Sequence, residues 1–323
     1  MMNRLSRLSP EQRAAISESS PESAKPALTA QDKQDREDFL YLLSVMETQG
    51  ASGITQSTDY VDAIAYKDRL KSFLEKEAPE GSVTQLFNDI IFDFDGVLYD
   101  STYAVYKTLG LMIERKGDKQ IPSPKTIHEI ARSYQAPFQT FYTRFGITLE
   151  TPEEIATFKK TFTEVMLQID KKHHAPSTLY PEVKQVLDAI RQARSDQTHL
   201  KIHIISAAPP AFIHAALEMH GITGDFDEIH TDCHDKTAMI TSIRDHADRK
   251  NSTVMIGDLP SDIKDAQRAG VNTIAVARRS GEQERLGMYL PDYIVTDLRG
   301  LLNLTSYCKE LRLKIYDKQG EKA

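Results

Sequence analysis

The sequence predicts an α/β protein that has a Rossmann-like parallel-sheet core, an inserted all-helical cap and a helical N-terminal extension. From residue 176 onward, short apolar runs alternate with amphipathic helical stretches, which is typical of βαβ units and a parallel sheet. An earlier apolar run, Ile90–Phe92, is followed by helical periodicity without a convincing strand over 102–175. We therefore expect the core to comprise 88–101 and 176–305, interrupted by a cap at 102–175.

The composition argues against a nucleic-acid-binding, disulfide-rich or membrane-spanning protein. The 323 residues carry a net charge of -7, whereas a general nucleic-acid binder usually has a basic domain or stripe. The two cysteines, Cys233 and Cys308, are too few for a disulfide framework and are typical of a reducing compartment. No apolar run reaches the roughly 18–20 residues of a membrane span. We expect a cytoplasmic protein without nucleic-acid or membrane partners.

The segments outside the predicted core differ from it in composition. Residues 1–35 are rich in Ser, Pro, Glu, Gln and Lys, which predicts a disordered tail. Amphipathic patterns within 36–87 predict a helical N-terminal extension, which is a candidate surface for a protein partner or self-association. Residues 306–323 are expected to form a C-terminal helix or tail.

The cap has two clear helix starts. Ser123-Pro124 pairs an N-cap residue with proline at the first helical position, and Thr151-Pro152-Glu153-Glu154 adds a capping box. Apolar residues recur at helical spacing after Pro152, which supports a long last helix. Substrate contact within the cap is expected from four polar side chains: Arg115, Arg132, Tyr134 and Arg144.

The core elements follow in order after the cap. Predicted helices cover 181–194, 211–219, 236–249 and 262–269. Predicted strands cover 201–205, 228–231, 253–256 and 273–276, with an edge strand at 293–295. In a parallel sheet the carboxyl ends of all strands lie at the same edge, so the polar residues that follow these strands are expected to converge there.

The converging residues are suited to phosphoryl transfer. Two carboxyl groups, Asp93 and Asp95, follow the first strand, and a serine, an aspartate pair and a helix-opening lysine follow later strands: Ser206, Asp258, Asp262 and Lys236. A carboxylate can attack phosphorus, and a second carboxyl group can protonate the leaving oxygen and then activate water. A hydroxyl, a lysine and a divalent cation can offset the negative charge of the phosphate.

In this order and spacing the chain resembles the haloacid dehalogenase superfamily, in particular its Mg2+-dependent phosphatases with a helical cap after the first strand. The resemblance covers roughly 88–300 and rests on four motifs: Asp93-Phe94-Asp95-Gly96-Val97, Ser206, Lys236 and Gly257-Asp258-Leu259-Pro260-Ser261-Asp262. Val97 replaces the commoner threonine, and Thr237 replaces the proline that often follows the lysine.

The resemblance implies a catalytic role for three residues and a metal site built from acids. Asp93 would be the nucleophile that becomes an aspartyl-phosphate, Asp95 would be the general acid and then the base, and Lys236 would steady the Asp93 carboxylate. Mg2+ would be held by the side chains of Asp93 and Asp258 and by the backbone carbonyl of Asp95. Asp262 would be a further ligand or a residue that orients the ligands. Taken singly, Asp262 could instead be the N-cap of its helix.

The resemblance also implies how the substrate phosphate is held. Ser206, Ala207, Lys236 and Gly96 would surround it, and the substrate would be a small phosphorylated metabolite. Two alternatives remain open: a sugar-phosphate mutase that uses the same core residues, and a protein whose main role is partner binding through the N-terminal helices. Hydrolytic dehalogenases lack the acid found here at Asp95, which argues against dehalogenation.

A second group of candidate ligands is weaker. His230, Cys233 and His234 are close in sequence, as in some zinc sites. Their spacing is unusual and a fourth ligand is not apparent, so the sequence alone does not predict zinc there.

Overall fold

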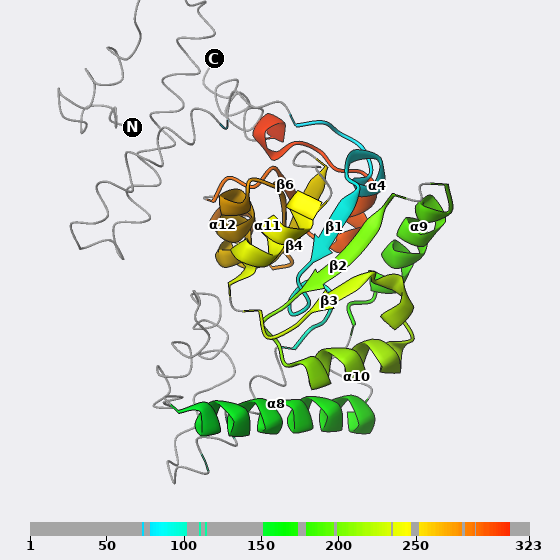
Figure 1. Cartoon of the computed structure of the whole chain (residues 1–323). Helices are drawn as coiled ribbons and strands as arrows, with labels where there is room; N and C mark the ends of the chain where they lie inside the picture. Colours follow the sequence, from blue (N-terminus) through cyan, green and yellow to red (C-terminus); the bar gives the residue numbers. More distant parts are fainter. Residues whose placement is uncertain are drawn as a thin grey trace, which may run out of the picture. The chain divides into compact units, whose positions relative to one another are not determined.

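The computed structural model describes residues 73, 78–101, 110, 114, 151–173, 179–196, 199–233, 235–246, 252–279, 282–287 and 289–310. One compact unit, Ala78–Tyr307, contains a six-stranded parallel sheet flanked by helices (Figure 1). Its strands are β1 Asp89–Phe92, β2 Lys201–Ile205, β3 Glu228–His230, β4 Thr253–Gly257, β5 Asn272–Val276 and β6 Tyr293–Val295. The predicted α/β fold with a parallel sheet is confirmed.

The order of the strands determines where a ligand can bind. It is β3-β2-β1-β4-β5-β6, so the chain runs outward from β1 to β3 and then returns to the other side of β1 as β4. In open sheets of this order, the carboxyl ends of the two strands at the reversal border a crevice that binds ligands. Here these strands are β1 and β4, which pair directly through Phe92 and Ile256.

The described helices are α4 Val83–Leu86, α8 Pro152–His173, α9 Val183–Asp196, α10 Pro210–His220, α11 Lys236–His246, α12 Pro260–Ala269 and α13 Glu282–Gly287, with 3-10 turns η2 Thr223–Asp225 and η3 Leu298–Leu302. Helices α8 to α12 lie close to their predicted positions, whereas α4 and α13 were not predicted as separate helices. Helix α12 begins two residues earlier than predicted, because Pro260 occupies the first turn, where its missing N–H costs nothing. Asp262 is therefore inside the first turn and is not the N-cap.

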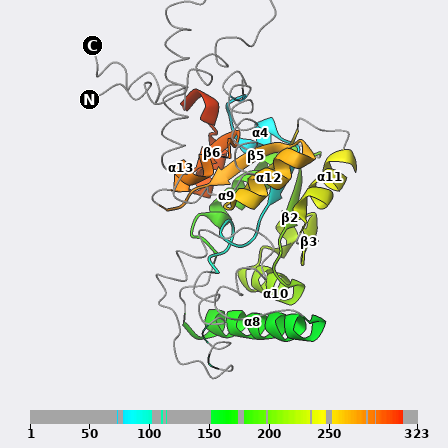
Figure 2. The same ribbon diagram turned by 90° about the vertical axis from the view of Figure 1, so that its left-hand side faces the viewer.

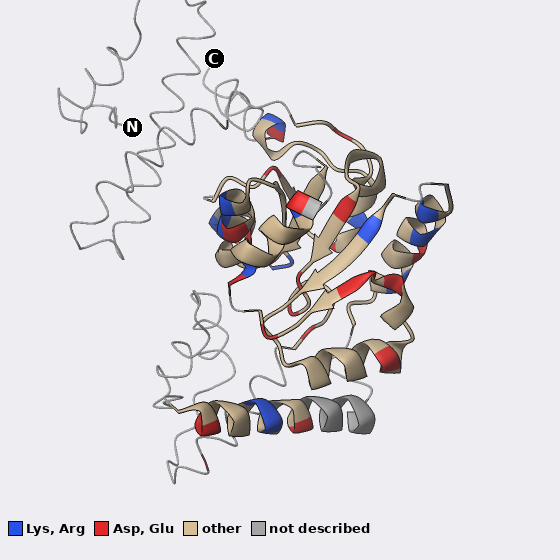
Figure 3. Ribbon diagram, in the orientation of Figure 1, with Lys and Arg blue, Asp and Glu red and all other residues tan. Residues whose placement is uncertain are grey.

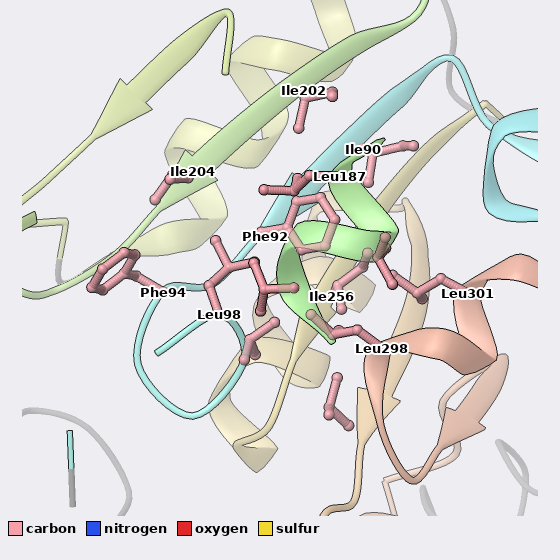
Figure 4. Close-up of a cluster of buried hydrophobic side chains, with 14 of the residues drawn as sticks. Ile90, Phe92, Phe94, Leu98, Leu187, Ile202, Ile204, Ile256, Leu298 and Leu301 are labelled. Atoms are coloured by element: carbon pink, nitrogen blue, oxygen red, sulfur yellow. The ribbon is translucent and has the colours of Figure 1, made fainter. Parts of the chain in front are cut away.

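Alternation along the strands sends side chains to two separate hydrophobic layers. On one face, Ile91 of β1 packs with residues of α11 and α12 such as Ile240 and Ala266. On the other face, Ile90 and Phe92 pack against α9, α10 and η3 (Figure 4). Both faces of β1 are covered, and all four of its residues are buried, as expected for a central parallel strand.

Helix α8 is the described part of the predicted cap. The Thr151 hydroxyl accepts from the Glu154 backbone N–H at 3.2 Å, and the Glu154 carboxylate accepts from the Thr151 N–H at 3.0 Å, so the predicted capping box is confirmed. The buried Phe158 belongs to the same hydrophobic cluster as residues of α10, and Figures 1 and 2 show α8 alongside α10.

Several predictions fall on residues that the structure does not describe. They include almost all of 1–77, the cap segment 115–150 with its four polar side chains Arg115, Arg132, Tyr134 and Arg144, and the C-terminal residues 311–323. The domain boundaries proposed for these segments stay predictions.

None of the described helices combines the length and apolar character that a membrane span requires. Basic and acidic residues both occur on α9 and on α12 (Figure 3).

An aromatic cluster supports the loop that follows β1. The rings of Phe94 and Tyr99 stack with centroids 5.4 Å apart, and Phe212 of α10 meets both edge-on, at 5.6 and 5.4 Å. Phe212 is 1% exposed, so its ring makes all of its contacts with other parts of the protein.

We expect Phe212→Ala to lower the free energy of unfolding by about 3–5 kcal/mol, because it leaves a cavity beneath the loop. Met219→Ala, on the same helix but 42% exposed, is the matched control and should change it by about 0.5 kcal/mol or less. Urea denaturation measures both. Equal effects of the two substitutions would contradict this account of the loop's support.

Candidate active site

The two strands at the sheet's reversal deliver acids to one crevice. The Asp93 backbone N–H donates to the Ile256 carbonyl at 2.9 Å, which continues the β1–β4 pairing one residue beyond β1. Asp258 follows directly after β4. Ser206 follows β2 on the other side of β1. The predicted convergence of strand ends is therefore present in the structure.

Two helices on one face of the sheet add a lysine and a further acid. Lys236 opens α11 and Asp262 lies in the first turn of α12. The Lys236 Nζ is 3.0 Å from Asp93 Oδ1 and 2.8 Å from Asp262 Oδ1, and all three side chains are buried. The other oxygen of Asp262 accepts from the Leu259 backbone N–H at 3.1 Å, which fixes its orientation.

The loop after β1 folds back on itself directly beside Asp258. Gly96 has φ +79°, and a side chain at this position would collide with the Asp258 carboxylate. The Gly96 N–H donates to the Tyr99 carbonyl at 2.8 Å, and the Leu98 N–H donates to the Phe94 carbonyl at 2.9 Å. Only glycine allows both this backbone conformation and so close an approach of the acid.

Burial shifts the acids towards their protonated forms. It raises the pKa of Asp93 to about 7, against the opposing charge of Lys236 and with support from Asp262 and Asp95. It raises the pKa of Asp95 to about 6, although a hydrogen bond with Ser101 works in the opposite direction. The pKa of Asp258 is also raised well above its ordinary value by burial, with Asp262 and Asp93 adding to the effect.

The pKa of Lys236 shifts in the direction that keeps its side chain positively charged. Burial disfavours the ammonium form, but the carboxylates of Asp262 and Asp93 outweigh this and raise the pKa of Lys236. The lysine is therefore a permanent positive charge among acids that crowd one another.

Three of the acids could hold a cation together. Oxygen atoms of Asp93, Asp258 and Asp262 lie within 4.8 Å of one another. Asp258 Oδ1 is buried and has no hydrogen-bond partner within the described part of the chain, which is costly unless a positive ion or a proton is supplied. An all-oxygen donor set suits a hard divalent cation. The carboxyl oxygens of Asp95 are not part of this group.

Two of the predicted phosphate-binding residues, Ser206 and Ala207, occupy the turn after β2. The Ser206 hydroxyl accepts from the Ala208 N–H at 3.1 Å, and the Ser206 backbone N–H donates to the His230 carbonyl at 2.9 Å. Ser206 is buried, whereas Ala207 is exposed. Because a hydroxyl can donate and accept at once, Ser206 keeps its hydrogen for another acceptor.

Sequence reasoning missed an arginine that braces the catalytic loop. Arg278, after β5, donates to the carbonyls of Gly96 at 3.1 Å and Val97 at 2.7 Å and to the buried Glu182 carboxylate at 2.6 Å. Its guanidinium also lies 3.5 Å from the centre of the Tyr180 ring. The signal was weak: a basic residue that follows a predicted strand is most often a solvated charge.

A contact between α8 and the core was also missed. Lys159 Nζ is 2.6 Å from Asp232 Oδ1. Asp232 has φ +53° and lies between β3 and the start of α11, and its N–H donates to the Ala208 carbonyl at 3.0 Å. The cap helix thus reaches the same turn that carries Ser206.

Comparison with known proteins identifies the family. The family model for haloacid dehalogenase-like hydrolases matches residues 90–276, more than half of the chain. The chain belongs to the haloacid dehalogenase-like hydrolase family. The predicted superfamily is thereby confirmed, and with it the prediction of an enzyme.

Individual relatives of this family are distant in sequence. The chain is 24% identical to pyrophosphatase PpaX of Oceanobacillus iheyensis, over 67% of this chain and 95% of that protein. It is 23% identical to phosphoglycolate phosphatase of Aliivibrio fischeri, over 69% and 100%. A haloacid dehalogenase-like hydrolase from Streptococcus pneumoniae shares the fold with a TM-score of 0.51 at 19% identity, over 67% and 97%. The names of these relatives are consistent with phosphatase activity.

We expect Arg278→Met to lower the free energy of unfolding by about 3–5 kcal/mol, because it leaves the Glu182 carboxylate buried without its partner. Arg268→Met is the matched control, since Arg268 is exposed and its pair with Asp265 adds about 1 kcal/mol or less. Urea denaturation measures both.

The double variant Arg278→Met/Glu182→Leu distinguishes the buried pair from general loss of packing. We expect it to be less destabilised than the sum of the two single variants. Simple additivity would show that Arg278 does not act through Glu182.

Proposed function

We propose that this chain is a Mg2+-dependent phosphatase that hydrolyses a small phosphorylated metabolite through an aspartyl-phosphate on Asp93. The observation that carries the proposal is the position of the Lys236 ammonium, 3.0 Å from Asp93 and 2.8 Å from Asp262 at the carboxyl end of β1. This arrangement joins a nucleophile, a charge partner and an acid that can bind a cation within one crevice.

Asp93 is held for attack on phosphorus. Its Oδ1 accepts from the Phe94 backbone N–H at 2.7 Å and faces Lys236, so the carboxylate has a fixed orientation. A carboxylate oxygen forms a bond to phosphorus while the bond from phosphorus to the leaving oxygen breaks. Orientation of the nucleophile in this way reduces the entropic cost of reaching the transition state.

Asp95 is suited to carry the proton in both half-reactions. Burial raises its pKa to about 6, so it is protonated in roughly one molecule in ten at pH 7, far more often than an ordinary aspartate. It first gives this proton to the leaving oxygen. In the second half-reaction it takes a proton from water, whose oxygen attacks phosphorus and releases inorganic phosphate and the Asp93 carboxylate.

Ser206, Ala207 and Lys236 are proposed to hold the phosphate oxygens. An ammonium has three donors, and two of them face Asp93 and Asp262, which leaves the third for a phosphate oxygen. The Ser206 hydroxyl and the Ala207 backbone N–H add neutral donors. Because the N–H of Gly96 donates to Tyr99, we assign Gly96 the role of making room for Asp258.

Asp93, Asp258 and Asp262 fit a Mg2+ ion, together with the Asp95 backbone carbonyl. When bound, Mg2+ would offset the negative charge that accumulates on the phosphate oxygens. The buried and unpartnered oxygen of Asp258 supports this assignment.

A panel of small phosphorylated compounds should identify the substrate. Relatives named for pyrophosphate and phosphoglycolate make these two compounds the first members of a substrate panel. The assay should follow both inorganic phosphate and the fate of the organic product. A product in which the phosphate has moved to another position would favour the sugar-phosphate mutase.

We expect Asp95→Asn to lower kcat by about 10²–10⁴-fold, since it removes the proton donor. Asp93→Asn should abolish phosphate release, as should chelation of Mg2+ by EDTA. The control is Asp188→Asn on the exposed side of α9, which should act like the original chain. If Asp93→Asn hydrolysed substrate as fast as the unsubstituted chain, the covalent mechanism would be wrong.

The effect of Mg2+ on stability should depend on pH. Because the folded-state pKa values of Asp93, Asp95 and Asp258 are raised, the folded chain binds these protons more tightly than the unfolded chain does. Their contribution to stability is present in acid and is lost as the pH rises through about 6 to 7. In EDTA the melting temperature should therefore fall between about pH 5 and pH 8.

Mg2+ should reverse this loss, because it binds the ionised carboxylates. The rise in melting temperature on adding Mg2+ should be larger at about pH 8 than at about pH 5, by roughly 2–4 °C for each kcal/mol involved. Differential scanning fluorimetry measures it. The Asp258→Asn variant is the control, and its response to Mg2+ should be reduced at both pH values.

A further inference from the structure

A second cluster of metal-ligand side chains lies away from the acidic crevice. It consists of Asp89 on β1, His203 on β2 and Glu228 and His230 on β3, and Figure 3 shows the acidic residues of β1 and β3 on the sheet. The register pairs His203 with Glu228 across the β2–β3 ladder. Because side chains alternate along a strand, all four point to the same face of the sheet, the face covered by α11 and α12.

The four side chains form a continuous chain of short contacts. His203 Nε2 is 3.3 Å from Asp89 Oδ1, and His203 Nδ1 is 3.6 Å from Glu228 Oε2. Glu228 Oε2 is in turn 3.0 Å from His230 Nε2. Candidate ligand atoms of His203, Glu228 and His230 all lie within 4.8 Å of one another.

The contact with Asp89 determines what His203 can do. The Asp89 carboxylate can only accept, so Nε2 is the ring nitrogen placed to donate to it, and Nδ1 is the one that faces Glu228. His203 is 5% exposed, and its buried Nδ1 has no hydrogen-bond partner among the residues that the structure describes. A cation between Nδ1 and the Glu228 oxygen would give both atoms a partner.

We propose that His203, Glu228 and His230 bind a divalent transition-metal ion, with Zn2+ as the first choice. His203 would contribute Nδ1, Glu228 a carboxylate oxygen and His230 Nε2, and Asp89 would orient His203. Metal-bound histidines commonly donate their other ring N–H to a carboxylate in this way. At Zn–ligand distances of about 2.0–2.2 Å, ligand atoms lie roughly 3–3.5 Å apart, close to the separations observed here.

Charge and access support this choice of ion. Two carboxylates and two neutral imidazoles carry a total charge that a divalent ion balances. Imidazole ligands favour Zn2+ and similar metals, whereas Mg2+ favours oxygen. The Glu228 side chain is 55% exposed, which provides an entry route and room for water as a fourth ligand.

The site is separate from the proposed catalytic one. Asp89 and Asp93 are four residues apart along β1 and its end, which corresponds to about 13 Å at roughly 3.3 Å per residue. Bound metal would join the edge strand β3 to β2 and would not take part in phosphoryl transfer.

The test uses the full chain, stripped with a chelator and then kept in excess Mg2+ so that the acidic crevice does not compete. Titration of Zn2+ against a chromophoric chelator should show one Zn2+ per chain. Co2+ in place of Zn2+ should give visible absorption bands of a low-coordinate nitrogen and oxygen site. Asp89→Asn should weaken Zn2+ binding by about 10–100-fold.

The ligand variants and their controls make the test specific. His230→Gln and Glu228→Gln, both at partly or largely exposed positions, should each weaken Zn2+ binding at least tenfold while circular dichroism shows a folded chain. His214→Gln, at an exposed histidine of α10, and Asp258→Asn in the acidic crevice should bind Zn2+ as the original chain does.

Three results would overturn the proposal. The original chain could fail to take up Zn2+ in the presence of Mg2+. His230→Gln could retain the original affinity. NMR of the metal-treated chain could show His203 protonated on both ring nitrogens, which would mean that a proton occupies the position proposed for the metal.

Discussion

The contact of Lys236 with Asp93 and Asp262 is the constraint on which the rest of the site depends. Each of these acids is buried, and in the absence of a positive charge their mutual repulsion would favour protonation or separation. Lys236 opens α11, Asp262 lies in α12 and Asp93 directly follows β1, so one ammonium group joins the two helices on one face to the end of the central strand. The contacts that position the nucleophile therefore also hold α11 and α12 against the sheet.

A second set of contacts holds the loop that contains Asp95 and Gly96. The aromatic cluster of Phe94, Tyr99 and Phe212 supports it from below, and Arg278 binds two of its carbonyls from the side. The loop is fixed by residues far away in sequence, which explains how a short motif can maintain so close an approach of Gly96 to Asp258.

Much of this could be predicted from sequence because it depends on local patterns. Alternating apolar runs identified the strands, and the Thr151 capping box located the start of α8. The positions of Asp93, Ser206 and Asp258 after apolar runs were enough to expect them at one edge, since parallel strands share their direction. Arg278 could not be found in this way. Its structural role depends on Glu182, almost a hundred residues earlier in the chain, and on two backbone carbonyls that come together only in the folded loop.

The same reasoning explains why the cluster of His203, Glu228 and His230 was not predicted from sequence. His230 was considered beside Cys233 and His234, its neighbours along the chain, whereas strand register places it beside His203 and Glu228. Proximity in a parallel sheet is set across strands and not along them. The two clusters then differ in chemistry as well as position: the crevice offers oxygen ligands and a lysine, and the β2–β3 cluster offers two imidazoles and one carboxylate. By ligand type, the crevice favours hard cations and the β2–β3 cluster favours borderline ones.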